Sequence, residues 1–198
     1  MLTRTTTSFL LSAMADHRNQ DGWLEFDSRY RPILVAFARR LGLGEADAAD
    51  AAQEALTRFL TALREGKFNR DRGSVRSWIT GIARNCIRET HDRRARRREE
   101  RGLSALNELP ADENLIQIWD EECHRSLVQH ALLELKEETH TDPKTIRAFE
   151  LLALQGRTPA EVSQLMGMTR NDVYLAKHRC LTRLRYILDS LQEAYEMS

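Results

Sequence analysis

The sequence predicts an all-α fold of two small helical domains joined by a linker. Three observations favour it: Ala, Leu, Arg and Glu dominate the composition, β-branched runs are nearly absent, and apolar residues recur at helical spacing along most of the chain. The chain has 198 residues, 41% of them hydrophobic, which is enough for two small cores. We place the first domain at residues 8–100, the linker at 101–116 and the second domain at 117–195.

The charges balance in number but are segregated along the chain. Basic and acidic residues number 30 each, so the formal net charge is zero. Arginines are dense from Arg70 to Arg101, acids dominate from Glu108 to Glu138, and basic residues return after Lys144. Two basic blocks around an acidic one indicate two elements that face nucleic acid and a spacer that avoids it. Charge alone leaves ordinary solvated helix surface as an alternative.

Nothing in the sequence indicates an enzyme or a metalloprotein. Cys86, Cys123 and Cys180 are odd in number and far apart, without the spacing of a zinc site, which fits a reduced compartment. No nucleophile and base are grouped as in a catalytic triad. The N-terminal apolar run at residues 9–11 is too short for a signal sequence or a membrane span. We therefore expect a cytoplasmic, nucleoid-associated protein without catalytic residues, metal or cofactor.

The first three predicted helices lead to an acidic ridge. A short helix runs from Ser8 to about Met14, and a longer one carries apolar residues at helical spacing from Trp23 to Leu41, bent or restarted at Pro32. A third helix, 45–64, has a clear apolar stripe. Its other face carries the acidic ridge, which consists of Asp47, Asp50, Gln53 and Glu54. The ridge in isolation is equally compatible with solvated surface.

A loop at residues 68–75 leads into a long basic helix. Its apolar face includes Trp78, Ile79 and Ile87, and its opposite face carries, at spacings of four, Arg76, Thr80, Arg84 and Arg88. The run from Arg93 to Arg98 is too charged to pack without a polyanion. Together with Asn85 and Phe68, this surface is of the type that holds and unstacks single-stranded bases. We expect Trp78 to belong to the core.

Helical periodicity resumes near Asn114 after the linker, and a further helix opens at Asp142-Pro143, as N-cap and first-turn proline, and closes at Gly156. The next stretch contains two capping boxes, Thr158…Glu161 and Thr169…Asp172, eleven residues apart, with Gly167 between them. This pattern predicts a helix-turn-helix.

The predicted helix-turn-helix has an apolar inner side and a polar outer side. The residues expected between its helices are Val162, Leu165, Met168 and Val173. The residues expected to face outward are Arg170, Asn171, Tyr174, Lys177 and His178, with Arg183 flanking. Donors at the start of a recognition helix suit base edges, and arginines further along suit phosphates. A plain αα-corner in a helical bundle is the alternative.

With these motifs placed, the chain from about Ser8 onward resembles an extracytoplasmic-function (ECF) sigma factor. Three stretches carry the resemblance: residues 26–32 with 47–56, residues 71–85, and the helix-turn-helix through Arg185. It implies a sigma domain 2 that binds core RNA polymerase and recognises and melts the −10 element, and a sigma domain 4 that recognises the −35 element. It also implies an anti-sigma factor as a further partner, and no membrane association.

The resemblance assigns roles to individual residues. Those implied to bind polymerase are Asp47, Asp50, Gln53 and Glu54. Those implied to contact the −10 element are Phe68, Arg84, Asn85, Arg88, Arg93 and Arg94. Those implied to contact the −35 element are Arg170, Asn171, Tyr174, Leu175, Lys177, His178 and Arg179. The sequence departs from the family pattern at Ala51-Ala52, where a bulkier pair is usual, and at residues 174–176, which puts the −35 preference in doubt.

Two other functions are compatible with parts of the sequence. A dimeric helix-turn-helix regulator would bind a palindromic site without polymerase; the asymmetric basic tail and the acidic ridge argue against it. A degenerate sigma domain that titrates another factor would bind polymerase and open no promoter. Charge reversal at Asp50 and Glu54 distinguishes a sigma factor from the dimeric regulator. It should abolish polymerase binding in a sigma factor and leave DNA binding intact in the regulator.

Overall fold

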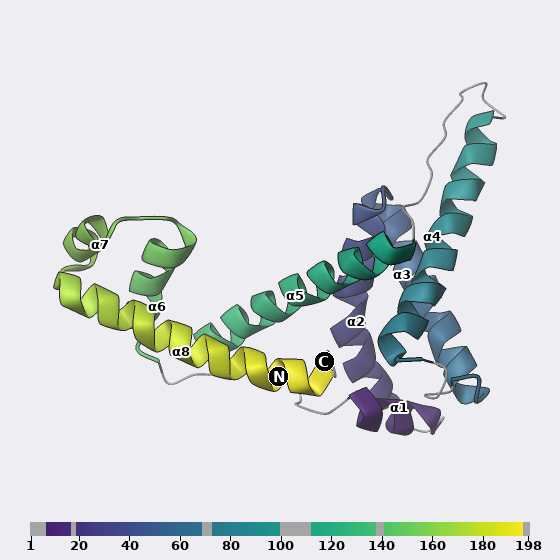
Figure 1. The fold of residues 1–198 in the computed structure, drawn as a ribbon, viewed down its shortest axis with the longest axis horizontal. Coiled ribbons are helices and arrows are strands. Elements are labelled where there is room, and N and C mark those ends of the chain that lie inside the picture. The colour runs from purple at the N-terminus through teal and green to yellow at the C-terminus, as the bar shows by residue number, and fades with distance from the viewer. Residues whose placement is uncertain (1–6, 17–18, 69–72, 100–111, 138–140, 196–198) are drawn as a thin grey trace. The chain divides into compact units, whose positions relative to one another are not determined.

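The computed structural model describes residues 7–16, 19–68, 73–99, 112–137 and 141–195, and its ordered elements are all helical (Figure 1). The chain divides into two compact units, Met1–Ser126 (unit 1) and Leu127–Ser198 (unit 2). The predicted all-α fold is confirmed. Most of the predicted linker lies outside the described residues, and the functional boundaries at 100/101 and 116/117 remain a prediction.

Unit 1 begins with four helices: α1 (Thr7–Ala15), α2 (Gln20–Arg40), α3 (Glu45–Arg64) and α4 (Val75–Glu99). Helix α1 packs on α2 and α3, and α3 packs between α2 and α4. The bounds of α3 are those predicted from its pattern. Pro32 neither breaks nor restarts α2, which is a single helix through it. Asn19 caps α2, its side-chain oxygen accepting a hydrogen bond from the Gly22 N–H at 3.0 Å.

An aromatic stack and an alanine face form the core of unit 1. The Phe59 ring lies 4.9 Å from Phe26 and 4.6 Å from Trp78, so it joins α2 to α4 through α3. Along α3 the buried positions include four alanines, Ala48, Ala51, Ala52 and Ala55. Small side chains let helix backbones approach closely. The Ala51-Ala52 pair, at which the sequence departs from the family pattern, is therefore part of the core of unit 1.

Helix α5 (Asp112–Glu137) contributes its first half to unit 1. Trp119, 2% exposed, sets its ring edge-on to Phe37 of α2, with centroids 5.5 Å apart. The carboxylate of Glu122 is buried and accepts hydrogen bonds from Arg40 at 3.1 Å and Arg125 at 2.7 Å. A buried carboxylate needs such partners to offset its desolvation.

Unit 2 contains the second half of α5, α6 (Pro143–Phe149), a π-helical turn η2 (Glu150–Leu154), α7 (Pro159–Met166) and α8 (Arg170–Tyr195). The predicted Asp142 cap is confirmed, since its carboxylate accepts from the Lys144 N–H at 3.2 Å. A small apolar cluster holds α6, η2, α7 and α8 together and consists of Ala148, Leu151, Val162, Val173 and Ala176. Met168 packs on this cluster as predicted.

Two predicted orientations are wrong. Leu165, expected between the two helices of the helix-turn-helix, is 63% exposed. Helix α7 is only eight residues long, and Val162 and Met166 already cover its inner side. Thr80, expected on the basic face of α4, is buried, and its hydroxyl donates to the Arg76 carbonyl at 2.7 Å. A threonine satisfied by its own helix can be buried at little cost.

Candidate nucleic-acid interface

The acidic ridge lies on the solvent side of α3. Its side chains alternate with the buried alanines, so Asp50, Gln53 and Glu54 are exposed and Asp47 is half-buried. Gln53 accepts a hydrogen bond from Arg31 at 2.7 Å, and Glu54 pairs with Arg58 at 2.7 Å. Asp50 has no hydrogen-bond or ion-pair partner among the described residues. The ridge thus offers one unpaired carboxylate flanked by paired ones.

Ion pairs connect the ridge helix to α4. Arg58 of α3 donates two hydrogen bonds to Glu89 of α4, at 2.8 and 2.7 Å. This fork raises the pKa of Arg58 and lowers that of Glu89. Asp47, near the start of α3, pairs with Arg94 of α4. The acidic ridge and the basic helix therefore touch through charged side chains, which sequence spacing did not indicate.

A groove of about 490 Å³ runs between α3 and α4. Both basic and acidic side chains line it, and they include Asp50, Glu54, Arg58, Glu89, Arg93 and Arg96. Cys86 forms part of its floor, where burial raises the pKa of the thiol to about 11. With both signs of charge along its walls, the groove suits a partner that also carries both signs better than a bare polyanion.

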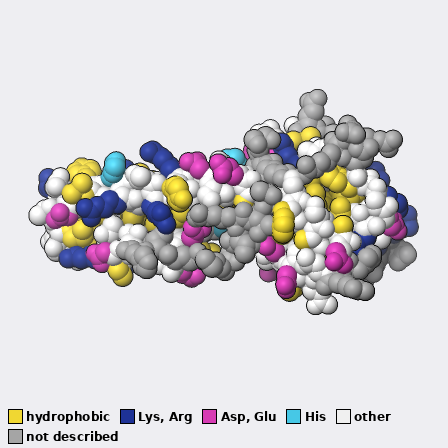
Figure 2. Space-filling view, turned by 90° about the horizontal axis from the view of Figure 1, so that it is seen from below, with side chains coloured by type: hydrophobic (Ala, Val, Ile, Leu, Met, Phe, Trp, Pro, Cys, Tyr) yellow, Lys and Arg dark blue, Asp and Glu magenta, His cyan; other side chains and the backbone are white. Residues whose placement is uncertain are grey.

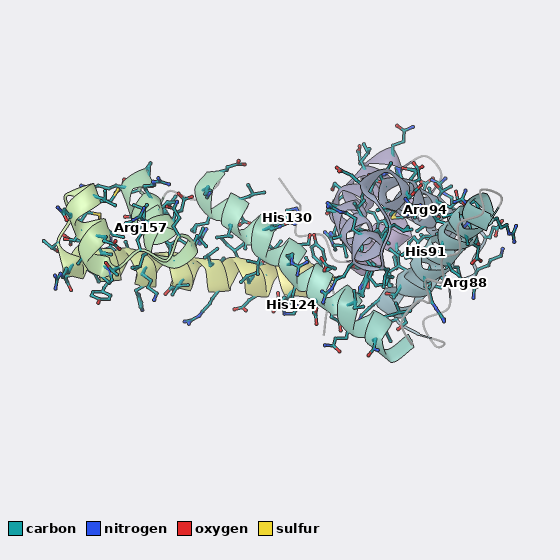
Figure 3. The ribbon with its side chains drawn as sticks, turned by 90° about the horizontal axis from the view of Figure 1, so that it is seen from above. Arg88, His91, Arg94, His124, His130 and Arg157 are labelled. Carbon is teal, nitrogen blue, oxygen red and sulfur yellow. The ribbon has the colours of Figure 1, made fainter. Side chains whose placement is uncertain are left out.

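The predicted −10 residues of α4 differ in their exposure to solvent. Asn85, Arg88 and Arg93 are exposed, whereas Arg84 and Arg94 are half-buried. Arg93 donates to the Thr90 hydroxyl at 3.0 Å. Figure 3 shows Arg88, His91 and Arg94 along α4. Arg88 and Asn85 are therefore accessible to solvent, whereas Arg94 is engaged with Asp47.

Phe68 and Trp78 form one aromatic surface. Phe68, the predicted base-capturing residue, stacks on Trp78 with ring centroids 4.8 Å apart and an interplanar angle of 26°. Both side chains are half-buried. Trp78 therefore packs in the core, as expected, while part of its side chain remains accessible to solvent. Trp78 therefore stacks on one face of the predicted base-capturing residue.

The helix-turn-helix in unit 2 is fixed by both predicted capping boxes. Thr158 and Glu161 exchange the two expected hydrogen bonds at the start of α7, and Thr169 and Asp172 do so at the start of α8. These bonds from the threonines lower the pKa of Glu161 and of Asp172. Gly167 ends α7 in the left-handed conformation, with φ of 59°.

All of the predicted −35 residues are exposed on one end of α8. They are Arg170, Asn171, Tyr174, Leu175, Lys177, His178 and Arg179. Figure 2 shows Lys and Arg side chains interleaved with hydrophobic ones on this part of the surface. Further along, the Arg183 guanidinium lies 5.3 Å from the centre of the Tyr186 ring, beside a concavity that His178 and Arg179 also line. The sequence prediction did not include Tyr186.

The described residues contain no cluster of three or more His, Cys, Asp or Glu side chains that could hold a metal ion. No helix within the described ranges is both long and apolar enough to cross a membrane. All three cysteines are buried as free thiols.

Residues 26–98 match the family described as Sigma-70 region 2. Unit 1 carries a Sigma-70 region 2 domain. The match contains the acidic ridge and every predicted −10 residue, and it ends before the helix-turn-helix.

Two further comparisons, with curated proteins and with solved structures, concern the whole chain. No curated protein matches it. Among solved structures, one described as "Structure of CnrH in complex with the cytosolic domain of CnrY" matches with 22% sequence identity and a TM-score of 0.37, covering 92% of this chain and 96% of that chain. The match to Sigma-70 region 2 lies entirely within unit 1.

Proposed function

We propose that this protein is a sigma factor of the ECF class, which binds core RNA polymerase and directs initiation at promoters with −10 and −35 elements. The observation that supports this most strongly is the presence, in one chain, of a Sigma-70 region 2 domain and a separate, fully capped helix-turn-helix. A region 2 domain alone would account for polymerase binding, and a helix-turn-helix alone would account for duplex binding.

In this proposal the acidic ridge docks on a basic surface of the polymerase. Asp50 makes the first contact because its carboxylate has no partner to give up. Gln53 and Glu54 extend the contact by exchanging Arg31 and Arg58 for polymerase side chains. Such exchange keeps each charge paired, which avoids the cost of a desolvated, unpaired carboxylate.

The two DNA contacts divide between the units. Asn85, Arg88 and Phe68 hold the unpaired −10 strand, whose bases stack and whose phosphates pair with arginine. In unit 2, Tyr174, Leu175, His178 and Arg179 read base edges of the −35 element, and Arg170 and Lys177 contact phosphates. Binding energy from these contacts favours strand opening without any catalytic step. Action at promoters places the protein in the cytoplasm, at the nucleoid, where an anti-sigma factor is a further expected partner.

The deciding experiment is run-off transcription on fragmented genomic DNA, with core polymerase in the presence and absence of the protein, followed by mapping of RNA 5′ ends. New starts that share two spaced upstream elements would support the proposal. No new starts, with the polymerase active on a control sigma factor, would refute it and favour a titrating protein or a polymerase-independent regulator.

A charge reversal tests the polymerase contact. Asp50→Lys should abolish polymerase binding in a pull-down, because it places a cation against a basic surface. Asp189→Lys makes the same change in net charge at an exposed position of α8 and should leave binding intact. If Asp50→Lys binds polymerase normally while DNA binding persists, the ridge is not the contact and the dimeric regulator is favoured.

A further inference from the structure

The ion pair between Asp47 and Arg94 joins two surfaces that the proposed function assigns to different partners. Asp47 belongs to the acidic ridge on α3, and Arg94 belongs to the basic helix α4. Neither side chain can satisfy an outside partner with the same atoms while the pair is closed. In the isolated protein, the closed pair therefore competes with the binding of an outside partner to either residue.

The local structure around the pair accommodates the Arg94 side chain. Both side chains are about one-third exposed, at 33% for Asp47 and 35% for Arg94. The Arg94 guanidinium also lies against the start of α3, where a Cβ added to Gly44 would be 3.3 Å from it. Glycine at this position thus leaves room for the arginine to reach across from α4.

Neighbouring residues of the same surfaces are not held in this way. Arg88, two turns earlier on α4, is exposed and has no hydrogen-bond or ion-pair partner among the described residues. Arg93 makes a hydrogen bond only to the neutral Thr90 hydroxyl. On the ridge, Asp50 has no hydrogen-bond or ion-pair partner within the part of the chain that the structure describes. Glu54 is paired within α3, with Arg58. Among the described residues, the Asp47–Arg94 pair is thus the one ion pair between a ridge carboxylate and a predicted −10 cation.

We propose that Asp47 holds Arg94 back from DNA in the protein alone, and that a basic partner docking on the acidic ridge releases Arg94 to a DNA phosphate. This inference rests on the proposed function and on the −10 contact that the family resemblance implies for Arg94. Polymerase and single-stranded DNA then bind with positive coupling, and because such coupling is reciprocal, each raises the affinity for the other by the same factor. The pair acts as a switch whose two positions are both fully charge-paired.

The size of the effect follows from the exposure of the pair. Partly exposed ion pairs change equilibria by about two- to fivefold. Removing the Asp47 charge should therefore strengthen DNA binding by the isolated protein about two- to fivefold. A newly available arginine that neutralises one phosphate of a single strand should also steepen the dependence of log K on log salt by about 0.7.

The test compares two isosteric substitutions that each remove one negative charge from the same ridge. Asp47→Asn opens the pair, and Asp50→Asn, the matched control, removes an unpaired carboxylate. The isolated full-length variants are titrated with a fluorescein-labelled 20-nucleotide oligo(dT) across a salt series, each also in an Arg94→Gln background. We expect the gain and the steeper slope for Asp47→Asn only, and their loss in the double variant Asp47→Asn/Arg94→Gln.

Equal gains for Asp47→Asn and Asp50→Asn, or a gain that persists without Arg94, would overturn the inference, because the effect would then be general electrostatics. That result would leave the proposed function intact if wild-type protein still supports run-off transcription. Conversely, loss of transcription with an intact Asp47–Arg94 effect would refute the sigma-factor proposal and leave the switch as a property of the domain.

Discussion

Replacement of Trp119 by alanine tests whether the first half of α5 belongs to the fold of the region 2 domain. The side chain is 2% exposed, and buried Trp→Ala changes cost about 3–5 kcal/mol. Its edge-on contact with Phe37 accounts for about 0.5–1.5 kcal/mol of this. Alanine recovers about 0.5 kcal/mol through its higher helix propensity. We therefore expect unit 1 to lose about 3 kcal/mol.

The assay must report on unit 1 alone, because a chain with two units need not unfold in one step. Hydrogen exchange of the α2 amides around Phe37 does so, and a 3 kcal/mol loss should speed their exchange roughly 150-fold. Ile116→Ala, at a position of α5 that is 43% exposed, is the control and should change exchange only a few-fold. A Trp119→Ala effect as small as that of the control would show that α5 does not stabilise this domain.

The remaining predictions concern turns and caps. Gly167→Ala should destabilise unit 2 by about 1 kcal/mol, because Gly167 has a φ of 59°. Gly81→Ala should instead stabilise unit 1 by about 0.5–1 kcal/mol, because Gly81 lies inside α4 with open space around it. Thermal unfolding distinguishes the two signs. Thr169→Ala should cost about 1 kcal/mol and weaken DNA binding, while Thr182→Ala, exposed on the same helix, should do neither. The folded-state pKa of Asp172 lies below its ordinary value, so the stability that Asp172 contributes is present above about pH 4 and is lost as the pH falls. Carboxyl NMR should show that the titration midpoint of Asp172 rises in Thr169→Ala. An unchanged midpoint would contradict the cap.

Local signals in the sequence were sufficient for the helices and the helix-turn-helix. The pattern of α3 predicted its bounds, and the capping boxes at Thr158 and Thr169 formed as predicted, because each depends on residues only three positions apart. The exposed positions of α8 followed from the same periodicity over a long helix.

Long-range and short-helix features could not be predicted in the same way. The Trp119–Phe37 contact joins residues 82 positions apart, and nothing in the local pattern of α5 indicates which core it enters. Leu165 lies on an eight-residue helix, where a stripe of two turns does not define the buried side. The Asp47–Arg94 pair depends on the approach of α4 to the start of α3, which is set by the buried alanines of α3.

The burial of all three cysteines limits the kind of signal to which the chain itself responds. Burial raises the pKa of Cys86 to about 11 and of Cys123 to about 12, and raises that of Cys180 as well. At pH 7 only about one Cys86 thiol in ten thousand is then ionised, and the thiolate is the form that oxidants and electrophiles attack. Burial and raised pKa values together make these three thiols poor targets for oxidants. For the same reason, the native thiols serve as reporters of unfolding, and site-directed labelling requires a cysteine introduced at the surface.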